Sequence, residues 1–237
     1  MLSLRFCAIA GAGLLLLTGL LYVVSPSPTA AAPTHLRGVS VVDGNTLQIG
    51  GRIFRLYGID APELGQLCHH DKKWDQCGVT AAFELRKLLK LDAPLTCTRA
   101  AADRKRYICH AGRTNLAKVL LGAGYAVAAP GSGAAYHHAE QEARDGKLGL
   151  WHMTFLPPSA WRAGKRLPGA PDAQQAKCPI KGVIDPAGRK LFYVPTDRGY
   201  KKIKVDPLKD EKSFCSVRSA RAAGWRRPGE APRRQRG

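Results

Sequence analysis

Three short apolar segments, separated by residues typical of tight turns, open the main part of this chain. The segments are Leu36 to Val42, Thr46 to Ile49 and Ile53 to Ile59, with Asp43-Gly44 and Gly50-Gly51 between them. Two glycines between apolar segments are a strong hairpin signal, and short strands joined by tight turns predict an antiparallel meander. Such a meander can close into a small barrel, which constrains the fold more than any other feature of the sequence.

Helix and strand signals alternate after this meander. Apolar residues recur at helical spacing in three segments, Val79 to Lys90, Asn115 to Leu121 and Tyr136 to Asp145. Further strand signals occur at Leu95 to Arg99 and Tyr107 to Cys109. Five strands and three helices in this order predict a mainly β fold, a five-stranded β-barrel with packed helices.

Composition divides the chain into five parts. The expected boundaries are a leader at 1–32, the barrel domain at 33–156, a linker rich in Pro, Ala and Gly at 157–177, a small module at 178–226 and a basic, disordered tail at 227–237. The small module has strand signals at Lys190 to Val194 and Lys202 to Val205, and a short helix signal from Ser216 to Ala223. Since so short a module buries little core, we expect a disulfide to stabilise it.

An apolar run from Phe6 to Val24 follows Arg5 at the N-terminus. The pattern is typical of an export signal, but the run is also about long enough to cross a bilayer. Ala30-Ala31-Ala32 offers a small-residue cleavage site, although Pro33 directly follows it. A cleaved signal and an uncleaved anchor stay open. Both place the remaining chain in the periplasm or outside the cell, with inner-membrane association if the anchor is kept.

Seven cysteines fit an exported protein. Cys7 lies in the leader, which leaves an even number in the remaining chain and favours disulfides. Sequence alone permits fifteen connectivities. The sequential pairs close short loops, and we expect them: Cys68–Cys77, Cys97–Cys109 and Cys178–Cys215. Zinc is the alternative, but the chain has no C-x-x-C pair.

Basic residues outnumber acidic ones, with 37 Lys and Arg against 18 Asp and Glu and a formal net charge of +19. This excess favours polyanionic partners, either nucleic acid or an acidic membrane face. It excludes no fold, because net charge concerns partners and solubility rather than topology.

The segment from Val41 to Glu63 carries residue types that phosphodiester hydrolysis needs. That reaction requires a positioned water, a base and positive charge around the phosphate. Asp60 is a hard oxygen ligand suited to Ca²⁺, and Glu63 follows it closely enough to act as the base. Arg55 offers a planar fork for two phosphate oxygens. Strand alternation places Arg55 and Asp60 on opposite faces unless the strand twists or bulges.

The same segment, VVDGNTLQIGGRIFRLYGIDAPE, resembles the signature of the staphylococcal nuclease family, which runs V-x-D-G-D-T and then R-L-x-G-I-D-A/T-P-E. Similarity continues through the helix signal at Val79 to Lys90 and ends at the LGLW string from Leu148 to Trp151. The resemblance covers about 120 residues of the chain. It implies an OB-fold barrel and, in active members, Ca²⁺-dependent cleavage of DNA and RNA.

The resemblance also implies a metal site. Asp60 matches an aspartate that ligates Ca²⁺, and Ala61 matches a residue whose backbone carbonyl does so. Asp43 matches an acidic residue near the metal. Asn45 falls where the family has its second metal-ligating aspartate. An amide oxygen can coordinate Ca²⁺, but one negative charge is lost, so metal affinity is expected to fall.

Catalytic roles follow from the same resemblance. Glu63 matches the base that orients the attacking water, and Arg55 matches the arginine that binds phosphate. The family's second catalytic arginine belongs to a D-x-Y-G-R motif that is altered here to AADRKRYIC. Counting five residues back from Cys109 gives Arg104, with Arg106 as the competitor if the loop is shortened.

The segment from Cys178 to Arg226 resembles a small module of exported nuclease-like proteins, sometimes called a sunset domain. It is interpreted either as an accessory nucleic-acid or envelope-binding module or as a structural cap. For the whole chain we expect an exported, monomeric, Ca²⁺-dependent nuclease with activity weakened at Asn45, preferring single-stranded DNA or RNA. The alternatives are an inactive nucleic-acid-binding module and an envelope structural protein.

Overall fold

The computed structural model of the chain describes residues 38–89, 93–171 and 178–230. The first two ranges form the N-terminal module and the third forms the C-terminal module. The leader or anchor expected at 1–32 and the end of the tail, 231–237, lie outside these residues. Among the described residues, no helix is both long enough and apolar enough to cross a membrane.

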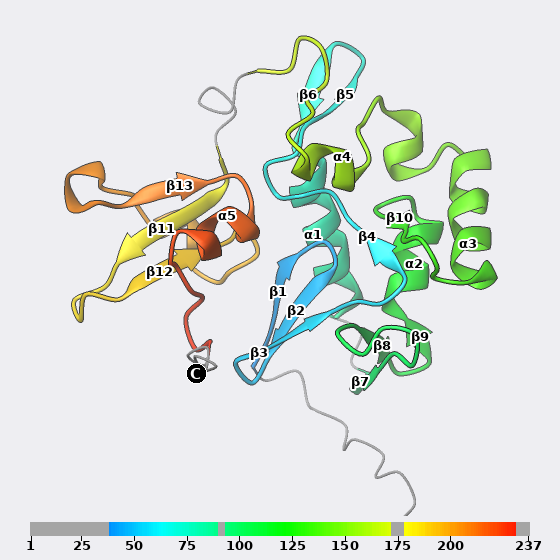
Figure 1. Ribbon diagram of the computed structural model, residues 1–237, viewed down its shortest axis with the longest axis horizontal. Coiled ribbons are helices and arrows are strands. Elements are labelled where there is room, and N and C mark those ends of the chain that lie inside the picture. Colours follow the sequence, from blue (N-terminus) through cyan, green and yellow to red (C-terminus); the bar gives the residue numbers. More distant parts are fainter. Residues whose placement is uncertain (1–37, 90–92, 172–177, 231–237) are drawn as a thin grey trace, which may run out of the picture. The chain divides into compact units, whose positions relative to one another are not determined.

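Figure 1 shows the elements of both modules. The strands of the N-terminal module are β1 (Val39–Asp43), β2 (Thr46–Ile49), β3 (Arg52–Arg55), β4 (Ile59–Asp60), β5 (Cys68–His70), β6 (Lys73–Asp75), β7 (Leu95–Arg99), β8 (Tyr107–Ala111), β9 (Thr114–Asn115) and β10 (Val127–Ala128). Its helices are α1 (Cys77–Leu88), α2 (Leu116–Gly122), α3 (Ala134–Asp145), the 3-10 helix η1 (Gly149–His152) and α4 (Pro158–Arg162).

The predicted meander is present as β1, β2 and β3, which pair antiparallel in that order. A bulge between Val41 and Asp43 interrupts the register just before the first turn. The third strand is shorter than predicted, because β3 ends at Arg55 and the chain turns at Gly58, where φ is +84°. The backbone then resumes as β4, which pairs with β10.

A second three-stranded sheet, β7-β8-β9, joins the meander through a parallel bridge between Leu56 and Tyr107. The Tyr57 amide donates to the Tyr107 carbonyl over 2.8 Å at the same place. Short sheets and interspersed helices make up this module, which confirms the prediction of a mainly β fold with helices.

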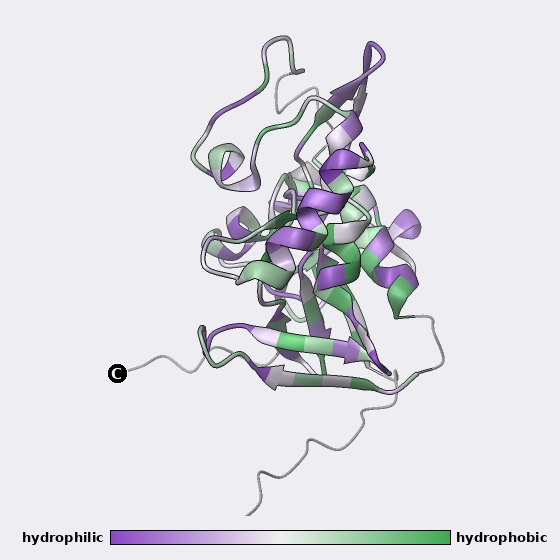
Figure 2. Cartoon of the chain, turned by 90° about the vertical axis from the view of Figure 1, so that its right-hand side faces the viewer, coloured by the Kyte–Doolittle hydropathy of each residue, from purple (hydrophilic) through white to green (hydrophobic). Residues whose placement is uncertain are grey.

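The helices cover the sheets with one apolar face each. Helix α1 packs on β1 and α2, and α2 packs on α3 and β8 (Figure 1). The residues that α1 buries are Cys77, Gly78, Ala81, Ala82 and Leu85. Figure 2 shows hydrophilic and apolar residues alternating along the helices, as one buried and one exposed face require. The N-terminal core that results supports the edge of the sheets at which β1, β3 and β4 end.

The C-terminal module is a three-stranded sheet, β12-β11-β13, packed against a short helix. Its elements are β11 (Ile180–Ile184), β12 (Lys190–Tyr193), η2 (Tyr200–Lys202), η3 (Pro207–Lys209), β13 (Lys212–Phe214) and α5 (Val217–Ala222). Trp225 fills the core of this module and is 2% exposed. The strand predicted at Lys202 to Val205 is wrong, because the 3-10 helix η2 runs to Lys202 and the residues from Ile203 to Val205 belong to no strand.

Disulfides join Cys68 to Cys77, Cys97 to Cys109 and Cys178 to Cys215. The first ties β5 to the start of α1, and the second joins directly opposed residues of β7 and β8. The third joins the start of the C-terminal module to the residue before the Ser216 N-cap of α5. Each bond therefore closes a loop that leads into an element of the core.

Two segments differ from the expected boundaries. Pro158–Arg162 forms helix α4 within the segment expected to be a linker, with Pro158 in the first turn, where its missing amide hydrogen costs nothing. Arg227, expected to begin a disordered tail, is 3% exposed. Its side chain donates to Gln48 over 2.8 Å and pairs with Asp197. A buried guanidinium needs such partners, so residues 227–230 are part of the structure.

Hydrogen bonds connect the two modules close to the end of β4. The Gly65 amide donates to the Cys215 carbonyl over 2.7 Å, and the Thr196 hydroxyl donates to the Val41 carbonyl over 2.8 Å. Gly65 also lies so close to Cys215 that a Cβ placed on it would be 2.6 Å from the Cys215 Cβ and carbonyl oxygen. Only glycine fits this contact without a backbone shift.

We expect Gly65→Ala to lower the free energy of unfolding by about 1–3 kcal/mol, because the added methyl group overpacks a contact made with backbone. Gly122→Ala is the matched control, since a Cβ there meets nothing within 4 Å. Urea unfolding followed by tryptophan fluorescence measures both variants. Equal stability of the two variants would show that the modules are not held together at Gly65.

Candidate functional site

A cavity of about 120 Å³ lies where β1, β3 and β4 end. Most of the residues that line it are charged or polar. The residues are Asp43, Asn45, Arg55, Asp60, Ala61, Pro62, Glu63, Arg106, Arg162, Val217 and Arg218. The structure thus brings together every residue predicted for the metal site and all predicted catalytic residues except Arg104.

The strand ends explain how Arg55 and Asp60 reach one cavity. Arg55 closes β3 opposite Thr46, next to the turn that holds Asn45. Simple alternation along one strand would separate Arg55 from Asp60, but the turn at Gly58 breaks the strand between them. The chain returns to the same edge in β4, and Asp60 is the last residue of that strand.

The turn between β1 and β2 is held by its own side chains. The backbone amide of Asn45 donates to Oδ1 of Asp43 over 3.0 Å, and the Thr46 hydroxyl donates to Oδ1 of the Asn45 side chain over 3.1 Å. All three residues are buried. The two side chains that the metal hypothesis uses in this turn therefore already accept hydrogen bonds from the protein.

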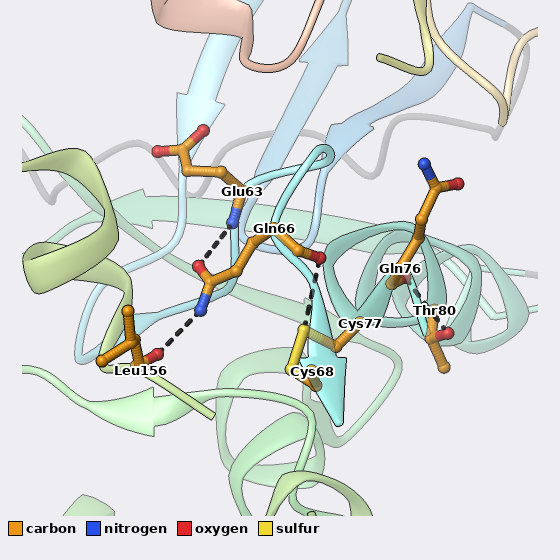
Figure 3. Close-up of a disulfide and its surroundings, with 7 residues drawn as sticks. All are labelled: Glu63, Gln66, Cys68, Gln76, Cys77, Thr80 and Leu156. Atoms are coloured by element: carbon orange, nitrogen blue, oxygen red, sulfur yellow. Dashed lines mark hydrogen bonds between the residues drawn. A yellow bond between two sulfur atoms is a disulfide. The ribbon is translucent and has the colours of Figure 1, made fainter. Parts of the chain in front are cut away.

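Glu63 is positioned by a buried glutamine (Figure 3). The Glu63 amide donates to the Gln66 side-chain oxygen over 3.3 Å, and the Gln66 side-chain nitrogen donates to the Leu156 carbonyl over 2.7 Å. Gln66 is 0% exposed, and its own carbonyl oxygen lies 3.5 Å from the sulfur of Cys77, which belongs to a disulfide. This network connects the loop of Glu63 to the segment that leads into α4.

The surroundings of Glu63 change its acidity. Burial of the carboxyl group, and secondarily the negative charge of Asp43, raise its pKa from 4.5 to about 7. Arg162 and Arg55 oppose this rise without cancelling it. A carboxylate with a pKa near neutrality is suited to exchange protons with water at physiological pH.

Arg162 of α4 makes the strongest contacts in the cavity. Its Nη1 and Nη2 donate to Oδ1 and Oδ2 of Asp60 over 2.9 and 2.6 Å, and Nη1 lies 3.4 Å from Oε1 of Glu63. A fork-to-fork pair of this kind combines charge with geometric specificity. Arg162 was not predicted, because the Pro, Ala and Gly content of its segment is typical of a linker. The Pro157-Pro158 pair was the available signal, since proline is favoured where a helix begins.

The two candidates for the second arginine lie in different places. Arg104 is exposed and does not line the cavity, whereas Arg106 does. A tight turn accounts for this, because the Arg106 amide donates to the Asp103 carbonyl and the Ala100 amide to the Arg106 carbonyl. The shortened loop directs Arg106 toward the carbonyls of Leu56 and Ile59, each 3.4 Å from its Nη1. The position of Arg106 in the cavity lining therefore favours it over Arg104, which the sequence count had given first.

Arg218 comes from the C-terminal module and was also missed. It lies on α5 beside Val217, and both residues line the cavity. Ser216 and Ser219 form a capping box at the start of this helix, and Val217 is 6% exposed. The helix was predicted from the sequence, but no signal in the sequence indicates which part of the chain the helix contacts.

The residues expected to bind Ca²⁺ have suitable chemistry but not a suitable arrangement. Carboxylate, amide and carbonyl oxygens are the ligands that Ca²⁺ takes. Both oxygens of Asp60 are occupied by Arg162, however, and the oxygen of Asn45 is neutral and accepts from Thr46. Among the described residues, no three Asp, Glu, His or Cys side chains group closely enough to hold a metal ion. As arranged, these residues do not fit a calcium site.

Comparisons with known proteins identify relatives. Residues 53–153 match the family model described as "Staphylococcal nuclease homologue". The chain is also 30% identical over 141 residues to the "Succinoglycan biosynthesis protein ExoI" of Rhizobium meliloti (strain 1021). That alignment covers 57% of this chain and 74% of the relative. The matched family segment contains Arg55, Asp60, Glu63 and Arg106.

The raised pKa of Glu63 predicts a pH-dependent effect of Glu63→Gln on stability. The unfolded chain releases this proton near pH 4.5, whereas the folded chain retains it to about pH 7. Between these values the unfolded state binds fewer protons, so the free energy of unfolding falls as pH rises. Glutamine has no proton to release. We therefore expect Glu63→Gln to stabilise the protein, by about 1–3 kcal/mol more at pH 8 than at pH 5.

Urea unfolding at the two pH values measures this difference. The control is Glu142→Gln, because the Glu142 side chain is 65% exposed and is expected to shift stability little at either pH. A Glu63→Gln variant that is less stable than the wild type at pH 8 would contradict the burial argument.

Proposed function

Since this chain belongs to the staphylococcal nuclease homologue family, we propose that it acts on the phosphodiester backbone of DNA or RNA as a nuclease of low activity. The observation that carries the proposal is the placement of Glu63 with Arg55 and Arg106 in one cavity. These groups provide a proton acceptor and positive charge, which are what the attack of water on a phosphodiester requires.

In the proposed reaction, a water oxygen attacks phosphorus, the bond to the leaving ester oxygen breaks, and that oxygen takes up a proton from solvent water. Glu63 accepts the proton of the water as the new bond forms, which its pKa of about 7 permits near neutral pH. The guanidinium groups of Arg55 and Arg106 face the charge that builds up on the phosphate oxygens. The family is Ca²⁺-dependent in general, but no step is assigned to Ca²⁺ because Asp60 is paired with Arg162.

We place this activity outside the cytoplasm. The apolar run that follows Arg5 and the three disulfides support an exported protein. The net charge of +19 supports nucleic acid as the partner, since its backbone is a polyanion.

Glu63→Gln tests the catalytic part of the proposal. We expect the wild type to cleave labelled single-stranded DNA or RNA slowly, and the variant to cleave at least about 100-fold more slowly, because glutamine cannot accept the proton. Glu142→Gln is the control for loss of a carboxylate elsewhere. Gel analysis of products over time, in Ca²⁺ and in EDTA, gives the rates. Equal rates for Glu63→Gln and the wild type would rule out Glu63 as the base.

A nucleic-acid-binding protein without nuclease activity is the second candidate. It is favoured by the neutral Asn45 and by the ion pair that occupies Asp60, since both reduce the negative charge available to a metal ion. If the wild type does not cleave, the double variant Asn45→Asp, Arg162→Ala separates the two candidates, because it adds one carboxylate and frees another. We expect this variant to gain Ca²⁺-stimulated cleavage. An inactive double variant that still binds Ca²⁺ would mean that more than the metal site has been lost.

A further inference from the structure

The Arg162 guanidinium binds the Asp60 carboxylate at the oxygens that a metal cation would contact. Two of its nitrogens contact both carboxylate oxygens of Asp60, and one of them also reaches Glu63. Its helix is fixed from the same side, because Leu156 accepts from Gln66 and Thr154 pairs with His69 just before α4 begins. The guanidinium is therefore a fixed part of the cavity wall, because the segment that leads into α4 is held by hydrogen bonds.

The charges around the cavity favour an anion. Four arginines line it (Arg55, Arg106, Arg162 and Arg218) against three carboxylates (Asp43, Asp60 and Glu63). Arg162 already neutralises much of the negative charge of two carboxylates, and the third accepts a hydrogen bond from the backbone of Asn45. A further cation entering the cavity would meet a net positive charge, whereas a phosphate would be attracted.

Two of these arginines are free to meet a ligand. Within the described parts of the chain, neither the Arg55 side chain nor the Arg218 side chain forms a hydrogen bond or an ion pair, and both residues are exposed. Arg55 closes β3 and Arg218 lies on α5, so they come from different modules. The Gly65–Cys215 hydrogen bond holds the segments that carry the cavity carboxylates and α5 together.

We propose that this cavity binds a phosphodiester group without a divalent cation. Arg162 takes the part of the metal by neutralising Asp60 and Glu63, and Arg218 of the C-terminal module joins Arg55 as a ligand of the phosphate oxygens. The ligand is the backbone of single-stranded DNA or RNA, so the inference rests on the proposed function for the identity of the polyanion. The inference adds two points to the proposed function: binding needs no metal ion, and the C-terminal module takes part in it. Arg162 is a positioning residue in this arrangement.

The experiment measures binding separately from cleavage. Full-length protein in a non-ionic detergent is titrated against a labelled phosphorothioate oligonucleotide, which resists hydrolysis, and fluorescence anisotropy is followed in EDTA and in Ca²⁺. Calorimetric titration with CaCl₂ reports metal binding directly. The variants are Arg162→Ala and Arg218→Ala. Their controls are Arg166→Ala, which packs on Trp161 outside the cavity lining, and Lys201→Ala, an exposed cation of the C-terminal module.

We expect the wild type to bind the oligonucleotide equally in EDTA and Ca²⁺ and to show no calorimetric signal for Ca²⁺. Arg162→Ala should weaken binding in EDTA about tenfold, because the freed carboxylates repel phosphate, and should gain both Ca²⁺ binding and Ca²⁺-restored affinity. Arg218→Ala should weaken binding about tenfold under both conditions. Both controls should stay within about twofold of the wild type. If Arg162→Ala does not fold, Arg162→Lys keeps the charge and should bind without Ca²⁺, though more weakly.

Two results would overturn the inference. One is a wild type that binds the oligonucleotide only in Ca²⁺, or binds Ca²⁺ as tightly as Arg162→Ala. The other is an Arg218→Ala variant no weaker than Lys201→Ala, which would remove the C-terminal module from the site. Binding in EDTA without any cleavage would sink the nuclease proposal and leave the inference standing. Cleavage and binding that both require Ca²⁺ would overturn the inference and leave the nuclease proposal standing.

Discussion

Three carboxylates around one small cavity are the constraint on which the rest of this site depends. Asp43, Asp60 and Glu63 would repel one another if all were charged and unpaired. Burial and the charge of Asp43 already raise the pKa of Glu63. Guanidinium groups from four separate segments of the chain compensate the remaining negative charge of the carboxylates. This requirement explains why residues far apart in the sequence, including part of α4, converge on the ends of three short strands.

The sequence predicted the N-terminal fold closely where local signals were strong. The two glycines at 50–51 specified a hairpin, and apolar spacing placed the three main helices within a few residues of their observed bounds. Prediction failed where one residue changed the course of the chain. Gly58 breaks the third strand, and alternation alone does not reveal that such a glycine has a positive φ. That same break is what places Arg55 and Asp60 together.

Only the part of the candidate site that lies in one linear motif was predictable from the sequence. Asp43, Asn45, Arg55, Asp60, Ala61 and Glu63 lie within one short segment, and the structure gathers all of them. Arg162 and Arg218 lie far from it in sequence, in segments whose composition suggested a linker and an accessory module. Their positions depend on tertiary contacts such as the buried Gln66 side chain and the Gly65 amide, and no spacing rule encodes these contacts.

The contact at Gly65 makes the cavity depend on both modules. Gly65 lies two residues after Glu63, and Cys215 lies three residues before Arg218, so one hydrogen bond joins the neighbourhoods of both side chains. Without the C-terminal module, Gly65 would lose the backbone contact that only glycine fits, and the cavity would lose the wall formed by Val217 and Arg218. The cavity is therefore complete only when the two modules are folded together.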